Sequence, residues 1–132
     1  GICYREFDTA AGPFMLPTTT PVHFEPDVLH QTIDRLLSYR PRRIVQTHFG
    51  PVTDLERLAR DLHADLDALV VMARRHAAAA DRAQRIRHDM FEHFNARLDA
   101  HGYAGSLARR HEFLDEDVNL NTQGLEVWLS RQ

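Results

Sequence analysis

Lysine is absent from this sequence of 132 residues, so all sixteen basic residues are arginine. Nineteen acidic residues outnumber them, and a net charge of −3 disfavours nucleic acid as the main partner, because phosphate binding requires a basic surface. The single cysteine, Cys3, excludes an internal disulfide and is typical of a reducing compartment, so we expect a cytoplasmic protein. The sequence has no apolar run long enough to span a membrane and no signal-peptide pattern.

The chain also lacks an initial methionine and begins directly with an apolar segment, Gly1 to Tyr4. We interpret it as part of a longer chain, although a processed terminus would look the same. Hydrophobic residues make up 43% and charged residues 27%, which indicates a globular domain rather than a disordered tail.

Proline divides the sequence into two unlike parts. Five of the six prolines precede residue 50, whereas residues 53–131 contain none. The first part is typical of short strands and loops around one helix, and the second is typical of helices. We therefore predict a mostly helical α+β chain, with one domain over residues 1–52 and a helical domain over residues 53–132.

Hydrophobic periodicity places the expected elements. Strands are predicted over residues 2–7, 14–16 and 44–47, the last of them buried, and an amphipathic helix over residues 26–39. A sharp loop is expected over residues 48–51. In the second part, Thr53 and Glu56 form a capping-box pattern ahead of an apolar stripe from Leu55 to Ala73. Asp81 either caps a separate helix or lies within one long helix, and a last helix is expected within residues 112–131.

His48 is the first candidate for chemistry, because it follows a predicted strand and precedes Phe49 and Gly50. Loops at strand ends commonly carry functional groups, and a neutral imidazole there can bind a metal ion. The alternative is a histidine that only packs against or caps the strand end.

The segment Arg42–Gly50, which ends in Thr-His-Phe-Gly, resembles the strand and turn near the end of metallo-β-lactamase-fold hydrolases. Three further segments are similar to one subgroup of that family. They are residues 1–5, residues 16–26 with their Leu-Pro-Thr-Thr-Thr-Pro run, and residues 121–125, Asn-Thr-Gln-Gly-Leu. The resemblance covers nearly the whole chain as a C-terminal portion of the family, in which two sheets are sandwiched between helices.

The resemblance implies that His48 is the last metal-binding histidine of a metal-dependent hydrolase, with zinc as the first choice of divalent metal. The family's His-x-His-x-Asp-His motif and its intermediate histidine are absent here, and its bridging aspartate would lie just before Gly1. One ligand does not make a catalytic zinc site, so we expect this portion alone to bind no metal and to be inactive. The expected partners are the N-terminal part of the same protein, a second copy of the chain, and a small-molecule ester, thioester, amide or phosphodiester substrate.

Other groups provide weaker candidates. The hydroxyls of Thr18, Thr19 and Thr20 could line the mouth of an active site, or the run could be a structural loop. Three helical pairs have the spacing of paired ligands but no second motif to complete a site: His88 with Glu92, Asp89 with His93, and His111 with Asp115.

The helical part has no predicted catalytic residue. We expect it either to cover the substrate opening or to form a dimer contact. An alternative of a different class is an autonomous helical interaction module, in which the stripe from Leu55 to Ala73 would bind a partner helix.

Overall fold

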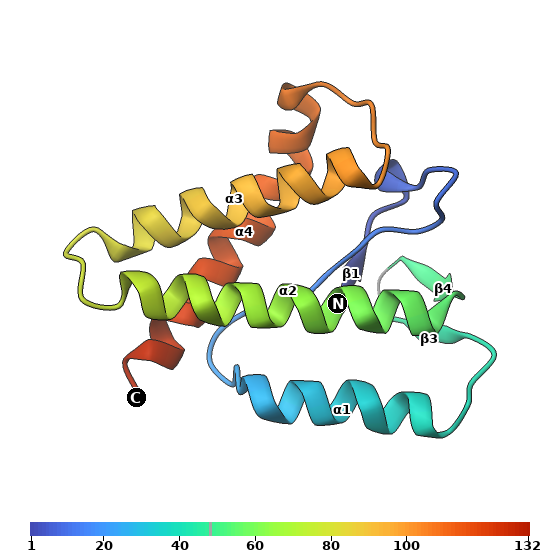
Figure 1. Ribbon diagram of the computed structural model, residues 1–132, viewed down its shortest axis with the longest axis horizontal. Coiled ribbons are helices and arrows are strands. Elements are labelled where there is room, and N and C mark those ends of the chain that lie inside the picture. Colours follow the sequence, from blue (N-terminus) through green and yellow to red (C-terminus); the bar gives the residue numbers. More distant parts are fainter. Residues whose placement is uncertain (48) are drawn as a thin grey trace.

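The computed structural model describes residues 1–47 and 49–132 and confirms the mostly helical α+β class (Figure 1). Its elements, in chain order, are β1 (Ile2–Cys3), a 3-10 helix (Arg5–Phe7), β2 (Met15–Leu16), α1 (Pro26–Ser38), β3 (Ile44–Gln46), β4 (Gly50–Val52), α2 (Leu55–His76), α3 (Arg82–Ala100) and α4 (Leu107–Leu129).

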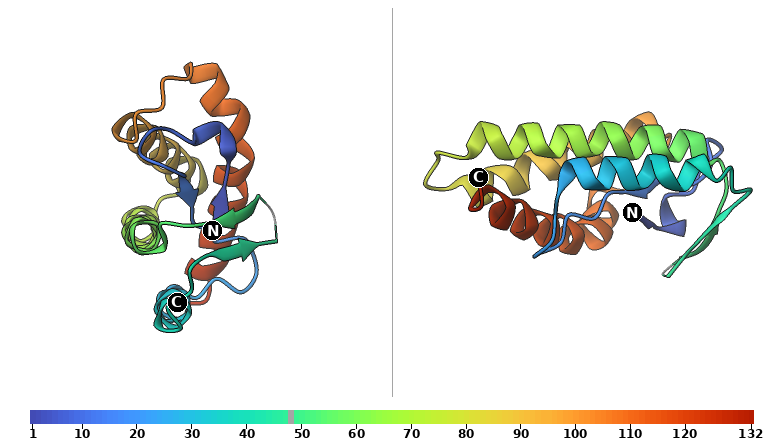
Figure 2. Two further views of the ribbon diagram at one scale, coloured as in Figure 1. Left: turned by 90° about the vertical axis from the view of Figure 1, so that its right-hand side faces the viewer. Right: turned by 90° about the horizontal axis from the view of Figure 1, so that it is seen from below.

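The helices form two layers, with the strands at one end. Neighbouring helices α1, α2 and α3 run antiparallel in the order of the chain, and α4 crosses behind them (Figures 1 and 2). The strands form two separate antiparallel pairs, β1 with β2 and β3 with β4. The β3–β4 hairpin lies where α1 ends and α2 begins, at one end of the molecule (Figure 1).

The main core lies between α2, α3, α4 and the first strands. It includes Phe7, Phe14, Leu66, Phe94 and Leu125, each with at most 1% of its surface exposed. At about 1.5–3 kcal/mol for each large apolar side chain, this burial is the main force that holds the helices together. Residues on both sides of the predicted boundary at 52 and 53 contribute to this core, and the division into two domains stays a prediction.

The start of α2 differs from the capping-box prediction. The N-cap residue is Asp54, which adopts a left-handed conformation with φ +56°, and no side chain caps the helix. Asp54 instead pairs with Arg57. The prediction of Thr53 as the cap was wrong because this left-handed residue separates Thr53 from the first turn.

The second and third helices are separate and do not form one long helix. α2 ends at His76 and α3 begins at Arg82. Asp81 is the N-cap residue, but its carboxylate accepts a hydrogen bond from Arg85 rather than from the backbone. The last helix begins at Leu107, five residues before the expected range, because the Ser106 hydroxyl accepts a bond from the Arg109 amide and starts the helix there.

The strands are shorter and more exposed than expected. The first ends at Cys3, and β3 is not the buried strand that was predicted, since Val45 is 67% exposed. The sharp loop expected after it is in fact a hairpin, because Gly50, Pro51 and Val52 pair with β3. A proline is tolerated in β4 because a strand with only one neighbour leaves one edge without ladder bonds.

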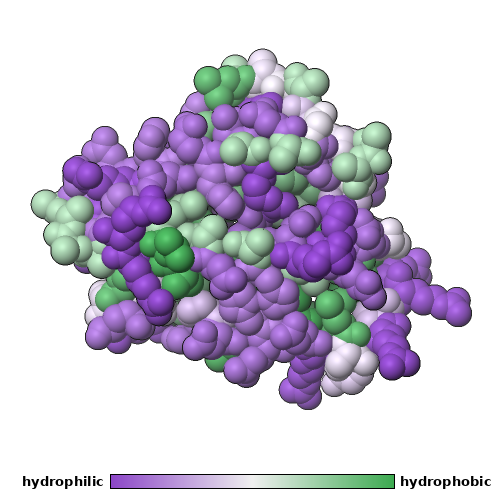
Figure 3. Space-filling view, in the orientation of Figure 1, coloured by the Kyte–Doolittle hydropathy of each residue, from purple (hydrophilic) through white to green (hydrophobic). Residues whose placement is uncertain are grey.

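The surface of the face drawn in Figure 3 is mostly hydrophilic, with separate hydrophobic patches. Among the described residues, no helix is both long enough and apolar enough to cross a bilayer.

Candidate functional site

The predicted metal ligand, His48, lies outside the described residues, so its side chain is not placed. The residues after it are described: Phe49 and Gly50 both have positive φ angles, +76° and +80°. Glycine adopts this conformation freely, whereas an aromatic residue does so at a cost of about 1–3 kcal/mol, and such strain concentrates at functional sites. The two residues directly after position 48 therefore both have left-handed backbone conformations.

The start of the chain lies against this hairpin. The Gln46 side chain donates a hydrogen bond from Nε2 to the Gly1 carbonyl at 2.7 Å, although 45 positions separate the two residues. Its Oε1 atom is buried and has no hydrogen-bond partner within residues 1–47 and 49–132. Beside it, the Tyr4 and Phe49 rings are in contact, with centroids 4.9 Å apart. The start of the chain thus contacts the hairpin through Gln46 and Phe49.

A partly buried hydrogen bond attaches the start of the chain to α4. The Tyr4 hydroxyl donates to Oδ2 of Asp117 at 2.8 Å. Burial, and next the hydrogen bond to Asp117, raise the pKa of Tyr4 to about 12. Burial also raises the pKa of Asp117, and the hydrogen bond from Tyr4 partly opposes that rise. The pair is a structural link between the first strand and the last helix.

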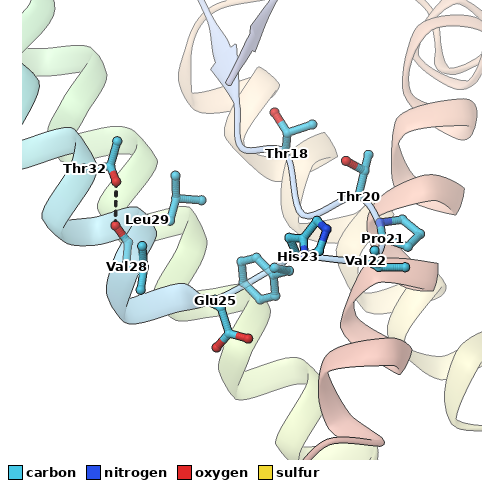
Figure 4. A pocket seen from close by; sticks show the side chains of 10 residues that line it. Thr18, Thr20, Pro21, Val22, His23, Glu25, Val28, Leu29 and Thr32 are labelled. Carbon is cyan, nitrogen blue, oxygen red and sulfur yellow. Dashed lines mark hydrogen bonds between the residues drawn. The ribbon is translucent and has the colours of Figure 1, made fainter.

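The three threonines proposed at a site mouth have different surroundings. Thr19 is only 1% exposed, and its hydroxyl donates to the Asn121 carbonyl at 2.9 Å. This side chain therefore attaches the loop to α4 and does not face a site mouth. Thr18 and Thr20 line an open depression of about 420 Å³. Figure 4 shows these two residues on one side of the depression and the α1 residues Val28 and Thr32 on the other.

Two of the segments that carry the family resemblance contact each other. Asn121 accepts a bond from the Thr19 amide at 2.8 Å through Oδ1, and its Nδ2 donates to the Pro17 carbonyl at 3.0 Å. One turn further along α4, Gly124 lies so close to this loop that a Cβ atom there would be 1.5 Å from the Thr19 carbonyl oxygen. Packing between the two segments therefore accounts for their residue types, although more than 100 positions separate them in the sequence.

The helical histidine pairs are mostly arranged differently from the spacing prediction. His111 and Asp115 do bond, at 2.9 Å, on an exposed face. His93 instead contacts Asp65 at 2.8 Å, and Asp89 contacts His76 at 2.8 Å. No group of three or more histidine, cysteine, aspartate or glutamate side chains in the described part of the chain is arranged to hold a metal ion.

Asp65 is a buried carboxylate that sequence reasoning did not single out. Its side chain is 1% exposed, and it contacts both His93 and Arg97. Burial raises the pKa of Asp65, while the hydrogen bond from His93 and the charge of Arg97 oppose that rise. The Arg97 guanidinium also lies over the Phe14 ring, 4.7 Å from its centroid. This cluster ties α2 to α3 and to the loop before β2.

A second arrangement that sequence reasoning missed joins α1 to α2. Nδ1 of His30 and Nδ1 of His63 are 2.5 Å apart. Nε2 of His63 contacts Asp34 at 3.0 Å, and Nε2 of His30 contacts Asp67 at 3.3 Å. The signal in the sequence was a histidine followed four residues later by an aspartate in each of two consecutive helices.

The apolar stripe proposed as a seat for a partner helix is used inside the chain. Leu58, Leu62, Leu66, Leu69 and Ala73 are all buried in the two core clusters. Most of this face of α2 therefore packs inside the chain, and the interaction module stays a prediction.

Comparison with known proteins gives no relative. No protein-family model, no curated protein and no solved structure matches the chain.

Proposed function

We propose that the chain is the C-terminal portion of a metal-dependent hydrolase of the metallo-β-lactamase fold, in which His48 is the last metal ligand. The observation that carries the proposal is the bond between Gln46 and the Gly1 carbonyl. In the family that the sequence resembles, the bridging aspartate would come just before Gly1. That bond supports a position for the aspartate close to the turn that follows β3.

Incomplete burial around α1 also supports the proposal. α1 has no fully buried residue, although Leu29, Ile33, Leu36 and Leu37 recur along it at helical spacing. These four residues line an apolar cavity of about 290 Å³ between α1, α2 and the hairpin. A helix with such a stripe is stable when the stripe packs on a sheet, and two-stranded sheets are marginal by themselves. The N-terminal strands expected from the resemblance would supply that missing surface.

The residues present could supply one ligand of a metal centre but not a complete set of ligands. His48 would be a ligand from this chain, and the buried Oε1 of Gln46 has no hydrogen-bond partner among the residues that the structure describes. When bound in the complete protein, the metal would supply an activated water for hydrolysis. The same proposal includes zinc as the metal, a cytoplasmic location and a homo-oligomer. It also includes a role for residues 53–132, either over the substrate opening or in a dimer contact.

The upstream coding sequence provides the first test. It should encode a His-x-His-x-Asp-His motif, an intermediate histidine and a Gly-Asp pair immediately before Gly1. An upstream sequence without these residues would refute the proposal.

Activity provides the second test. The full-length protein and its His48→Ala variant should be assayed against ester, thioester, amide and phosphodiester substrates. Activity toward at least one class, lost in His48→Ala and retained in the exposed control His111→Gln, is the expected result. Equal activity of His48→Ala and the wild type would contradict the role of His48.

A further inference from the structure

The two facing histidines between α1 and α2 present their Nδ1 atoms to each other. Their ring planes are within 3° of parallel, their centroids are 4.8 Å apart, and their Nδ1 atoms are 2.5 Å apart. If the rings were stacked face to face, a distance of 2.5 Å between the nitrogens would place the two ring planes closer than van der Waals contact. The rings therefore lie nearly in one plane, head to head, and each Nδ1 points at the other.

The protons of the two rings can be distributed in two ways. Three contacts lie in a row: Asp34 to His63, His63 to His30, and His30 to Asp67. The first two contacts are hydrogen bonds, whereas His30 and Asp67 are 3.3 Å apart and form only an ion-pair contact. A carboxylate and an imidazole nitrogen without hydrogen only accept, so each of the two hydrogen bonds needs one N–H group. Two neutral imidazoles carry two N–H groups, which satisfy both hydrogen bonds when His30 holds its hydrogen on Nδ1. When both Nε2–H groups face the carboxylates instead, two lone pairs are left facing each other at Nδ1.

We propose that His30 and His63 form a two-histidine site for a borderline divalent transition-metal ion such as Zn²⁺, Ni²⁺ or Cu²⁺, which ties α1 to α2. Imidazole is a ligand that suits these ions. Metal-binding histidines usually direct the second ring nitrogen at a carboxylate, and here both do so. The carboxylates favour the Nε2–H tautomer, which leaves Nδ1 free for the metal, and water would complete the coordination.

The seam between the helices can open to admit the ion. Zn–N bonds are about 2.0–2.1 Å long, so the two Nδ1 atoms must separate by about 1 Å from their present distance. Leu29 and Ile33 hold α1 against the core clusters, so the two histidine side chains rather than the helix would make most of this movement. The two side chains are 24% and 27% exposed, which gives an ion access from solvent. Figure 2 shows α1 and α2 side by side along this seam.

The surrounding charge favours a cation. His30 lines an open depression of about 380 Å³ together with Glu25, Asp27, Asp67 and Arg74. Three of these neighbours are acidic and one is basic, and on the other side of the pair Asp34 contacts His63. Protons compete with the metal for Nδ1, so metal affinity should fall as the pH drops through the range in which histidine protonates.

Thermal unfolding of the chain with increasing Zn²⁺ or Ni²⁺ tests the proposal. His48→Ala should be the background, which separates this site from the proposed hydrolase centre. We expect the melting temperature to rise with metal concentration at neutral pH, to return on adding EDTA, and to respond far less at about pH 5. The rise should vanish in His30→Gln and in His63→Gln and persist in the control His111→Gln.

Asp34→Asn provides a variant that keeps both rings, in case a histidine variant does not fold. It should bind metal about 10–100-fold more weakly, as loss of a supporting carboxylate usually does. The proposal would be overturned by no metal response in the His48→Ala background, or by a response in the glutamine variants as large as in that background. A response to pH alone would also overturn it and would show that the nitrogens share a proton only.

Discussion

Replacing Gly124 with alanine tests whether the contact between α4 and the threonine loop is as tight as the structure indicates. Helix propensity alone predicts that the substitution stabilises the chain by about 0.5–1 kcal/mol, because glycine is unfavourable within a helix. Packing predicts the opposite sign. The new Cβ atom would lie 1.5 Å from the Thr19 carbonyl oxygen, whereas ordinary contact begins at 3.4 Å, so the loop must move by about 2 Å.

The magnitude follows from what that movement disturbs. Asn121 forms three hydrogen bonds to the loop, two to Thr19 and one to Pro17, with lengths of 2.8–3.0 Å. Each contributes about 1 kcal/mol, and overpacking in a dense core costs about 1–3 kcal/mol. After subtracting the gain in helix propensity, we expect Gly124→Ala to lower the free energy of unfolding by about 3–5 kcal/mol.

Urea denaturation followed by circular dichroism measures this difference. Gln123→Ala is the matched control, because Gln123 is the neighbouring position of the same helix and is exposed. The control should change the free energy of unfolding by less than about 0.5 kcal/mol. A Gly124→Ala variant that is as stable as the wild type, or more stable, would refute the close approach of α4 to Thr19.

Two further predictions concern the buried polar groups. Tyr4→Phe should lower stability by about 1–3 kcal/mol, because Asp117 loses its partly buried donor. An alkaline absorbance titration should lose the tyrosine step near pH 12 in this variant and keep it in Tyr103→Phe; a step that persisted in Tyr4→Phe would contradict the assignment. Arg97→Met should cost about 3–5 kcal/mol at neutral pH because it leaves the Asp65 carboxylate buried without its cation, whereas the exposed control Arg85→Met should change stability little. The raised pKa of Asp65 means that the folded state binds its proton more readily than the unfolded state, so its contribution to stability falls as the pH rises from 3.8 through the raised value. The Arg97→Met penalty should therefore shrink in acid, and urea titrations across pH that give a constant penalty would contradict this role of Asp65.

Periodicity was sufficient to predict the helices. The stripe from Leu55 to Ala73 corresponds to the buried face of α2, and α1 was predicted to within one residue of its observed bounds. The helix starts were harder to predict, because a cap depends on local backbone geometry. The left-handed conformation of Asp54 displaced Thr53 from the capping role, and Ser106 started α4 ahead of its apolar residues.

The site could be predicted less completely, because contacts between distant segments leave little trace in local spacing. Nothing in the local sequence couples Gln46 to Gly1 or Asp65 to Arg97. His30 and His63 could have been found from the repeated His-x-x-x-Asp spacing, but their pairing depends on how α1 packs against α2. The buried strand predicted over residues 44–47 is exposed for a similar reason, since the burial of a strand depends on what covers its sheet.

The metal content of the full-length protein tests the central claim most directly. Protein purified without added metal should be measured by plasma mass spectrometry, alongside His48→Ala and the double variant His30→Gln/His63→Gln, each first shown to be folded. The account predicts bound zinc or another divalent metal in the wild type and in the double variant, and a loss of at least one metal equivalent in His48→Ala. Equal metal content in His48→Ala and the wild type would contradict the assignment of His48 as a ligand.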